Sequence, residues 1–333
     1  MQALTVEPGV AHSTRVEEVA EPAGDGVRVR VLEVGVCGTD REISEGLFGV
    51  STGDRLVMGH EMLGVVDADG HGFSRGDLVS ATVRRSCGHC LACAEGAPDS
   101  CLTGDYIERG ITKLDGFARE IVVEDPAQLV AIPRELGRLG VLAEPMSICA
   151  RGVRHALAIG NRQPWEPKRA LVTGAGAVGL LTTLLLRQHG FAVTVVSLEE
   201  SSPIADALGA RYAQEPDGTF DLVFEAAGDA QLMANGLGFL KRSGVVCLLG
   251  IDARERTVQL DGRVIGLDTV LENRVLFGSV NANHEDWNAG VAALARADRG
   301  LLEQLVALRV PLDRFEEAFA FHGGKATLVV SDG

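Results

Sequence analysis

The chain has 333 residues, and at about 100–200 residues per domain this length predicts two domains. Acidic residues outnumber basic residues by 46 to 31, so the net charge is −15, which argues against nucleic acid or an anionic membrane as the main partner. The N-terminus has no basic segment followed by an apolar core, so we expect no signal peptide and a cytoplasmic protein.

The first part of the chain consists mainly of predicted β-strands. Residues 27–31 alternate apolar and charged side chains, as a half-buried strand does, and further strands are predicted at 78–83, 117–123 and 129–133. No helical pattern of any length precedes residue 134. We therefore expect a mainly β domain.

Four cysteines follow the spacing C-x2-C-x2-C-x7-C: Cys87, Cys90, Cys93 and Cys101. Close thiolate pairs reach one ion from a tight turn, and four thiolates complete a tetrahedral zinc site with no open position. In a long chain without a leader, zinc is favoured over disulfides, although an unmetallated or disulfide loop is the alternative. His89 lies inside this loop and is interpreted as a solvated residue.

A second set of metal-binding side chains lies between residues 37 and 61. It contains Cys37, Asp40, Glu42, His60 and Glu61. Zinc binds all of these groups well, but a single Cys or His is more often structural. The hypothesis of a catalytic zinc therefore depends on the cysteine cluster and on the glycine-rich loop described next.

The pattern changes after a predicted helix over 147–159, for which Ser147 is the expected cap. The buried strand 170–173 leads into G-x-G-x-x-G, formed by Gly174, Gly176 and Gly179, and then into a helix that ends near residue 189. A strand before and a helix after are the context that a dinucleotide-binding loop requires. This context also disfavours a membrane span over the uncharged residues 170–186.

Further strands are predicted at 192–196, 221–225, 244–250 and 274–280, as in a doubly wound parallel sheet. Glu199 lies 20 residues after Gly179, where an acid accepts the ribose hydroxyls and repels a 2′-phosphate. No Arg or Lys occurs from residue 191 to 210, so NAD is favoured over NADP. The alternative is that Glu199 only begins the next helix.

Residues 285–321 are predicted to be helical, and 326–330 form a last strand that we expect to return to the first domain. The predicted division is therefore a zinc domain of residues 1–147, completed by 282–333 and carrying a cysteine lobe at 84–104. A nucleotide-binding domain would occupy residues 148–281.

The whole pattern resembles the medium-chain, zinc-containing alcohol dehydrogenase superfamily, and within it the microbial glucose (aldose) dehydrogenases. The segments that carry the closer resemblance are 37–43, 59–61, 82–85, 108–110, 142–145 and 278–281. The resemblance implies an α/β fold, in which a Rossmann domain is joined to a mainly β, GroES-like catalytic domain. It also implies hydride transfer from a secondary alcohol or an aldose to NAD(P), and a homodimer or homotetramer paired near 274–280.

The resemblance further implies two zinc ions per chain, one structural and one catalytic. The catalytic zinc would be held by Cys37, His60 and Glu144, with Glu61 as a candidate exchanging ligand. Asp40 would orient the His60 imidazole. From the residues alone, Asp40 is equally readable as a surface carboxylate and Glu144 as a capping carboxylate.

The same resemblance assigns the remaining site residues. Thr39 would carry the alcohol proton away, with Glu42 or solvent as the onward acceptor. Glu108 and Asn281 would contact the substrate. The implied cofactor-binding positions are Gly174, Gly176, Ala177, Val178, Gly179, Ser197, Glu199, Ala227, Gly250, Ser279 and Asn281.

Three apolar residues fall where a sugar site is expected to be polar: Val83, Ile148 and Leu271. An apolar wall tolerates substrates that lack the matching hydroxyl. The alternative function is therefore a dehydrogenase of polyols, cyclitols, modified sugars or other secondary alcohols with the same zinc chemistry. A non-catalytic nucleotide-binding redox sensor is a further alternative, but it would not need Cys37, His60 and Glu144 together.

Overall fold

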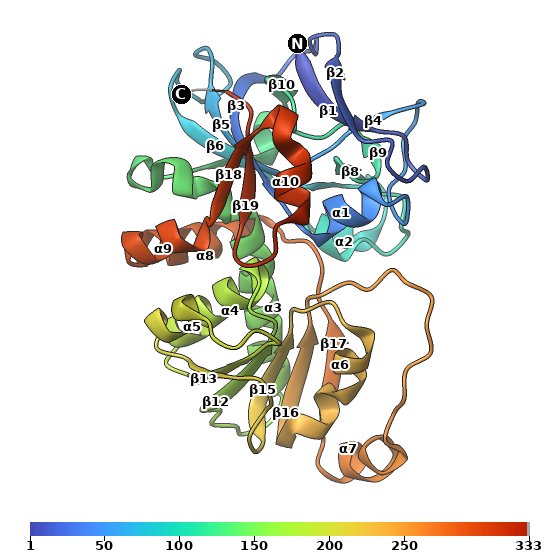
Figure 1. Cartoon of the computed structure of the whole chain (residues 1–333), viewed down its shortest axis with the longest axis vertical. Helices are drawn as coiled ribbons and strands as arrows, with labels where there is room; N and C mark the ends of the chain where they lie inside the picture. Colours follow the sequence, from blue (N-terminus) through green and yellow to red (C-terminus); the bar gives the residue numbers. More distant parts are fainter. Residues whose placement is uncertain (332–333) are drawn as a thin grey trace. The chain divides into compact units, whose positions relative to one another are not determined.

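The computed structural model describes residues 1–331 and divides into two compact units (Figure 1). The first unit contains residues 1–147, 281–296 and the chain from residue 306 onward, and the second contains 148–280 and 297–305. The expected division placed 297–305 in the first domain. This segment instead belongs to the second unit, because helix α9 (Arg299–Leu305) lies against α5 (Pro203–Ala207).

The first unit is built mainly from antiparallel strands. Its largest sheet has seven strands in the order β11-β6-β5-β3-β19-β18, with β10 paired to β3. Two three-stranded sheets, β2-β1-β4 and β7-β8-β9, accompany it. The strands are β1 Gln2–Val6, β2 Arg15–Glu18, β3 Val27–Val36, β4 Leu56–Val57, β5 Glu61–Val66, β6 Leu78–Ala81, β7 Arg84–Arg85, β8 Ile107–Arg109, β9 Lys113–Leu114, β10 Ile121–Glu124, β11 Leu129–Ala131, β18 Leu308–Pro311 and β19 Ala326–Val329.

Strand β3 is central to this unit. Val27, Val29 and Val31 are buried and alternate with half-buried arginines, which confirms the predicted half-buried strand. From residue 31 to 36 every residue is buried, so both faces of this half of the strand are covered. Strand β5 pairs along one edge of β3, and β10 and β19 share the other. The expected return of the last strand to this unit is also confirmed, since β19 pairs antiparallel with β3.

Several helices interrupt the first unit: α1 Gly38–Ser44, α2 Leu91–Ala94, α8 His284–Ala295 and α10 Phe315–Ala320. Short 3-10 turns lie at Pro98–Ser100, Pro126–Gln128, Arg134–Leu142 and Leu312–Arg314. The expectation of no helix before residue 134 was wrong for α1. Its N-terminus is capped by Cys37, whose Sγ accepts a hydrogen bond from Thr39 N, and cysteine is not among the usual capping residues.

The prediction that residues 285–321 are helical was wrong for residues 308–311. After α8 and α9 the chain forms β18, which pairs in parallel with β19. Pro311 ends the strand and lacks the N–H that a continuing helix would need. Pairing with a strand that follows later in the chain overrides the local helical pattern.

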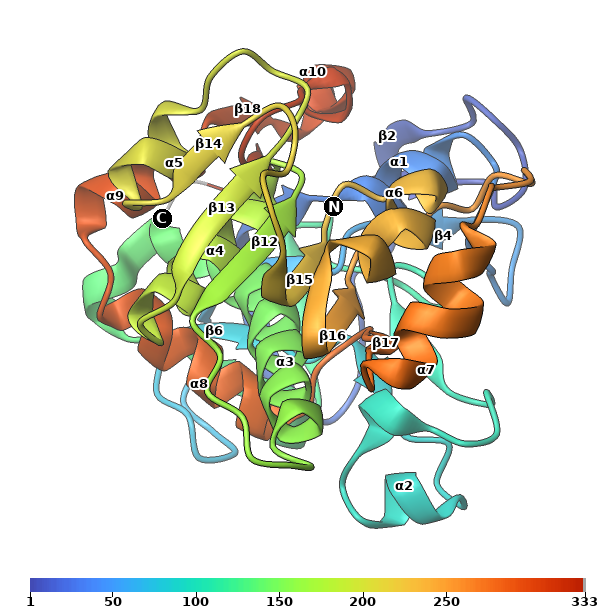
Figure 2. The same cartoon turned by 90° about the horizontal axis from the view of Figure 1, so that it is seen from below.

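The second unit contains a six-stranded parallel sheet in the order β14-β13-β12-β15-β16-β17 (Figure 2). This order is that of a doubly wound dinucleotide-binding sheet, with the change of direction between β12 and β15. The strands are β12 Arg169–Thr173, β13 Ala192–Val196, β14 Arg211–Ala213, β15 Phe220–Glu225, β16 Leu240–Leu248 and β17 Val275–Gly278. The predicted fold class is therefore confirmed.

The helical segments connected with this sheet are α3 Ala143–Gly160, α4 Ala177–Gln188, α5, α6 Ala230–Asn235 with the 3-10 turn Gly236–Phe239, the π-helix Val264–Asp268, α7 Thr269–Leu271 and α9. Helix α3 begins four residues before its predicted cap, Ser147. The Ser147 hydroxyl instead donates to Glu144 O within the first turn. None of the helices within residues 1–331 is both long and apolar enough to cross a membrane.

Candidate active site

Three candidate metal ligands from the ends of β3 and β5 meet in the first unit. One ligand atom each from Cys37, His60 and Glu61 lies within 4.8 Å of the others. The Sγ atom of Cys37 is 3.1 Å from Nε2 of His60. Thiolate, imidazole and carboxylate form a donor set that suits zinc.

The local backbone explains why these residues meet. Strands β3 and β5 are antiparallel and pair Gly35 with Glu61, so the end of β3 faces the beginning of β5. A Cβ on Gly35 would lie 2.0 Å from Glu61 Oε2, so only glycine leaves room for this carboxylate. Gly59 has φ +86° and turns the chain into His60.

Asp40 is buried and faces the imidazole of His60. Its Oδ2 accepts from Cys37 N at 2.9 Å, and its Oδ1 is 3.4 Å from His60 Nδ1. Burial lowers the pKa of His60, but the Cys37 thiolate and the Asp40 carboxylate outweigh burial and raise this pKa well above its ordinary value. Burial raises the pKa of Asp40, and the charge of His60 reverses that shift and lowers it. The site therefore favours a positive charge between Cys37 and Asp40.

Lys325 is a buried cation at the candidate metal site that sequence analysis did not identify. Its Nζ lies 2.6 Å from both carboxylate oxygens of Glu61 and donates to Val36 O at 3.1 Å. Both side chains of the ion pair are 2% exposed. Burial lowers the pKa of Lys325, and the charges of Glu61 and Cys37 outweigh it and raise this pKa. The only sequence signal was a lysine directly before the apolar strand β19.

Glu144, the predicted third ligand, lies in the first turn of α3 and is buried. It is not part of the three-residue cluster found among residues 1–331. Burial raises the pKa of Glu144 to about 8, the charge of Glu61 acts in the same direction, and His60 and Lys325 oppose it. The carboxyl group therefore lies within electrostatic reach of the cluster.

The residues present fit a zinc ion. His60 Nδ1 and Asp40 Oδ1 are buried, and neither has a hydrogen-bond partner among the residues that the structure describes. A divalent cation bound by Cys37, His60 and Glu61 would place positive charge where the raised pKa of His60 shows that positive charge is favoured.

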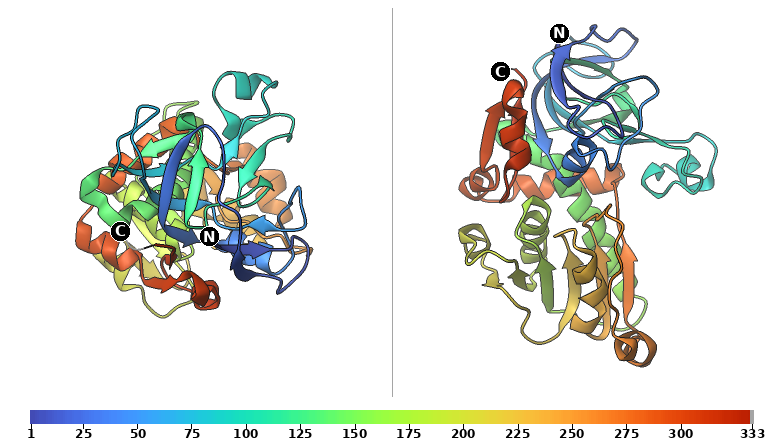
Figure 3. Two further views of the ribbon diagram at one scale, coloured as in Figure 1. Left: turned by 90° about the horizontal axis from the view of Figure 1, so that it is seen from above. Right: turned by 45° about the vertical axis from the view of Figure 1, so that its right-hand side comes forward.

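The four predicted structural ligands also lie together. Ligand atoms of Cys87, Cys90, Cys93 and Cys101 are within 4.8 Å of one another, and all four cysteines are free thiols. A backbone hydrogen bond from His89 lowers the pKa of Cys87 to about 5, and a hydrogen bond from Thr103 lowers the pKa of Cys101. The pKa of Cys93 is raised, so the lowered pKa values of Cys87 and Cys101 are the ones that favour the thiolates that zinc binds. The lobe extends from the rest of the first unit (Figure 3, right).

Two predicted substrate-contacting residues are joined by a hydrogen bond. Asn281 Nδ2 donates to Glu108 Oε1 at 2.9 Å, and Arg84 Nε reaches the same oxygen at 2.9 Å. Both Glu108 and Asn281 are buried. Asn281 has φ +65°, a left-handed conformation that asparagine tolerates better than most residues.

Backbone contacts join the segment that follows Glu108 to the residue before His60. A Cβ on Gly110, two residues after Glu108, would lie 2.4 Å from Gly59 O, directly before His60. Phe117 N also donates to Gly59 O at 2.8 Å. The segment that carries Glu108 therefore lies against the segment that carries His60.

The predicted proton-transfer residues lie on α1. Thr39 is in its first turn and donates its N–H to Cys37 Sγ at 3.2 Å. Glu42 follows three residues later, so the two side chains occupy neighbouring positions on one helix face.

The glycine-rich loop of the second unit is shaped for a dinucleotide. Gly174 has φ +96°, and a Cβ on Gly179 would lie 2.0 Å from Gly174 O. Gly176 is the N-cap of α4, and a Cβ there would meet nothing within 4 Å. Ala177 and Val178 open the helix. The open space at a helix N-terminus suits a pyrophosphate.

Glu199 lies in the loop after β13, exposed, and accepts a hydrogen bond from the Ser197 hydroxyl. Tyr212 Oη donates to Glu199 O at 2.8 Å. Leu198, which lies between Ser197 and Glu199 in the sequence, is 92% exposed. The structure therefore places an acidic and an apolar residue at the end of the second sheet strand.

The other predicted cofactor residues have protein partners of their own. Ala227 N donates to Glu225 Oε1 at 2.8 Å, and a Cβ on Gly250 would lie 2.6 Å from Glu225 Oε2. Burial raises the pKa of Glu225. Ser279 Oγ accepts from Arg151 Nη1 at 3.3 Å.

The three apolar residues questioned at the sugar site differ in exposure. Val83 is 2% exposed and directly precedes Arg84, whereas Leu271 is 64% exposed on α7. Ile148 is half-buried in α3. Val83 lies beside the Glu108 network, since Arg109 N donates to Val83 O at 3.1 Å.

Comparison with known proteins gives consistent matches over the whole chain. The family model described as "Glucose dehydrogenase C-terminus" matches residues 137–331, and "Alcohol dehydrogenase GroES-like domain" matches residues 23–134. Glucose 1-dehydrogenases from Thermoproteus tenax and Methanocella arvoryzae are 40% and 38% identical, with 96% and 95% of each chain covered. The structure of Haloferax mediterranei glucose dehydrogenase in complex with NADP, Zn and gluconolactone matches with a TM-score of 0.92, at 31% identity and full coverage of both chains.

Proposed function

We propose that this chain oxidises an aldose at the anomeric carbon. The proposal starts from its family: the chain belongs to the glucose dehydrogenase family of the zinc-containing, medium-chain alcohol dehydrogenases. The hydride acceptor would be NAD. The observation that carries the proposal is the contact between Gly59 and Gly110. It joins the segment that contains His60 of the metal-ligand cluster to the segment that contains Glu108, the hydrogen-bond partner of Asn281.

Two sets of residues would bind the two zinc ions. Cys37, His60 and either Glu61 or Glu144 would hold the catalytic zinc, and Cys87, Cys90, Cys93 and Cys101 the structural zinc. When bound, the catalytic ion would supply a Lewis acid that acidifies the substrate hydroxyl. Three protein ligands leave a position open for substrate.

Proton movement and orientation would come from the protein. Asp40 Oδ1 lies 3.4 Å from His60 Nδ1 and would orient the ring, whose Nε2 lies 3.1 Å from Cys37 Sγ. The Thr39 hydroxyl would receive the substrate proton, with Glu42 or solvent beyond it. Glu108 and Asn281 would accept from and donate to the other sugar hydroxyls.

NAD is proposed over NADP because Glu199 follows the second sheet strand and its neighbour Leu198 carries no charge. A carboxylate binds the ribose hydroxyls and repels a 2′-phosphate. The Haloferax mediterranei structure contains NADP, so the proposed preference differs from that relative.

The test is reduced-nucleotide formation by the zinc-loaded protein with D-glucose, D-galactose and D-xylose, beside inositols and simple secondary alcohols, with NAD and NADP in parallel. We expect turnover of an aldose, at least tenfold higher kcat/KM with NAD, and about two zinc ions per chain. Aldose inactivity combined with turnover of the other alcohols would refute the sugar assignment. Zinc content well below two in fully active enzyme would refute the two-site assignment.

A second candidate substrate class is favoured by Val83, which is buried beside the Glu108 network. An apolar residue there tolerates a less hydroxylated or larger alcohol, such as a polyol, cyclitol or modified sugar. The same substrate panel separates the two classes.

We also infer pairing of two chains along β17, the edge strand of the parallel sheet. Apolar side chains on and near this edge are exposed: Ile265, Val270, Leu271, Leu276 and Val280. An exposed edge strand with apolar neighbours is a common pairing surface.

A further inference from the structure

The guanidinium of Arg84 is held from three sides inside the first unit. Its Nε lies 2.9 Å from Glu108 Oε1, its Nη1 donates to Asp99 O at 3.0 Å, and its Cζ lies 3.7 Å from the centre of the Tyr106 ring. Arg84, Glu108 and Asp99 are all buried. A planar cation in such a setting has one orientation.

The position of Arg84 depends on two different parts of the unit. Strands β7 and β8 are antiparallel and place Arg84 directly opposite Glu108. Asp99 lies in the 3-10 turn between Cys93 and Cys101, within the cysteine lobe. The side chain of Arg84 therefore connects the lobe to the carboxylate of Glu108.

The bonds to Glu108 are unevenly distributed between its two oxygens. Arg84 Nε and Asn281 Nδ2 both reach Oε1. Within residues 1–331, Oε2 receives no hydrogen bond from the protein. A carboxylate only accepts hydrogen bonds, so Oε2 is left to accept one from a ligand hydroxyl.

We propose that Arg84 is a positioning residue for substrate recognition. It fixes Oε1 of Glu108 so that Oε2 faces the substrate, and the cysteine lobe controls this orientation through the carbonyl of Asp99. This inference rests on the proposed function, in which Glu108 accepts a hydrogen bond from a substrate hydroxyl other than the one that is oxidised.

The test compares Arg84→Lys with Arg85→Lys as a matched control. Lysine keeps the charge but loses the fork and the stacking on Tyr106. Arg85 is the next residue and is also paired, but with Glu124 at 2.8 Å, in a different network. Steady-state kcat and KM are measured for the preferred aldose and for a simple secondary alcohol.

We expect R84K to raise KM for the aldose about tenfold or more, while KM for the simple alcohol changes less than about twofold. R85K should leave both within about twofold. Tyr106→Leu, which removes only the stacking face, should shift the aldose KM in the same direction by a smaller factor. This variant preserves the test if R84K does not fold.

Glu108→Gln shows whether Arg84 acts through Glu108. In the E108Q background, R84K should change the aldose KM less than about twofold, because the carboxylate it positions is gone. Equal effects of R84K and R85K, or an undiminished R84K effect in E108Q, would overturn the inference alone. Wild-type protein that oxidises no aldose would instead overturn the proposed function and this inference with it.

Discussion

Lys325 balances the charges of the candidate metal site at the scale of single residues. The site collects the half-buried Cys37 with the buried Asp40, Glu61 and Glu144. Against these acidic groups it has His60 and Lys325. Lys325 bonds both oxygens of Glu61 and so holds that carboxylate against β3. Without the ammonium group, Glu61 would be a buried charge with no cation bonded to it.

Lys325→Met should therefore destabilise the zinc-free protein by about 3–5 kcal/mol, the cost of leaving one partner of a buried pair alone. The measurement is the free energy of unfolding in urea. Adding Glu61→Gln to K325M should restore part of the loss. Lys241→Met is the control, because its pair with Asp221 at 3.2 Å is 38% exposed on the lysine side and should contribute less than about 1 kcal/mol. Equal losses in K325M and Lys241→Met would contradict this account.

Residue types near one another in the chain were sufficient to predict Cys37, His60 and the four clustered cysteines as metal-ligand candidates. Lys325 could not be predicted, because it lies 264 residues from Glu61 and only the pairing of β19 with β3 brings the two together. The Arg84–Glu108 pair was missed for a similar reason, since it depends on the register of two very short strands.

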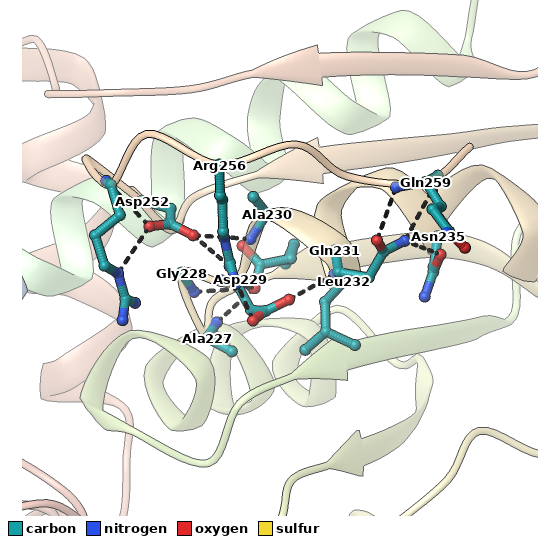
Figure 4. A network of polar contacts seen from close by, with 12 residues as sticks. Ala227, Gly228, Asp229, Ala230, Gln231, Leu232, Asn235, Asp252, Arg256 and Gln259 are labelled. Atoms are coloured by element: carbon teal, nitrogen blue, oxygen red, sulfur yellow. Dashed lines mark hydrogen bonds and ion pairs between the residues drawn. The ribbon is translucent and has the colours of Figure 1, made fainter.

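At the scale of elements, the segment 251–260 has no regular structure but is fastened to α6 (Figure 4). Asp252 accepts from Ala230 N at 3.2 Å and pairs with Arg256, which also reaches Asp229 at 3.0 Å. Gln231 and residue 259 exchange two hydrogen bonds, of 2.8 and 2.9 Å. Side-chain hydrogen bonds and ion pairs therefore hold this segment against α6, where no backbone hydrogen bonds of a β-sheet do so.

Asp252→Asn should release this segment. Burial opposes ionisation of Asp252, but hydrogen bonds from Ala230 N–H and from Arg254 and Arg256 outweigh burial and lower its pKa to about 2. A carboxyl with a lowered pKa stabilises the folded segment above its ordinary value of 3.8, and that contribution is lost as the pH falls towards 2. Hydrogen exchange of residues 251–260 should be faster in D252N at pH 7.

The wild-type segment should approach the D252N exchange rate between pH 4 and 2, after correction for the intrinsic pH dependence of exchange. Asp217→Asn serves as the control, because Asp217 is 74% exposed and belongs to a different ion pair. An unchanged rate in D252N at pH 7 would show that Asp252 does not fasten the segment.

Elements with strong local patterns were predictable, and those fixed by distant partners were not. The strands and helix around the glycine-rich loop follow directly from apolar periodicity and glycine punctuation. Helix α1 depends on an unusual cysteine cap, and β18 exists because β19 pairs with it. Local sequence propensity indicates neither the cysteine cap of α1 nor the pairing of β18 with β19.

At the scale of the whole molecule, the first unit is completed by the last part of the chain. Strand β19 lies between β3 and β18 in the seven-stranded sheet, and Leu328 on it is 2% exposed. Two domains could be predicted from length and composition. The assignment of α9 to the second unit could not, because it depends on packing against α5.

Leu328→Ala should lower the free energy of unfolding by about 2–5 kcal/mol, because it leaves a cavity in this core. Leu91→Ala is the matched control in the same unit, with a side chain that is 70% exposed, and should change stability by less than about 0.5 kcal/mol. Urea unfolding followed by circular dichroism measures both. A loss below 1 kcal/mol for L328A would show that β19 contributes little to the fold.

The place of β19 in the sheet has a consequence for synthesis on the ribosome. Half of one edge of β3 stays unpaired until β19 is synthesised. Strand β19 begins more than 170 residues after Ser147, the last residue of the N-terminal part of the first unit. At about 5–20 residues per second, this interval lasts roughly 10–40 s, during which the nascent first unit exposes an unpaired strand edge. The parallel sheet ends at Gly278 and is complete earlier. The first unit begins first on the ribosome and is finished last, so its nascent form is the stage at which chaperone binding matters most.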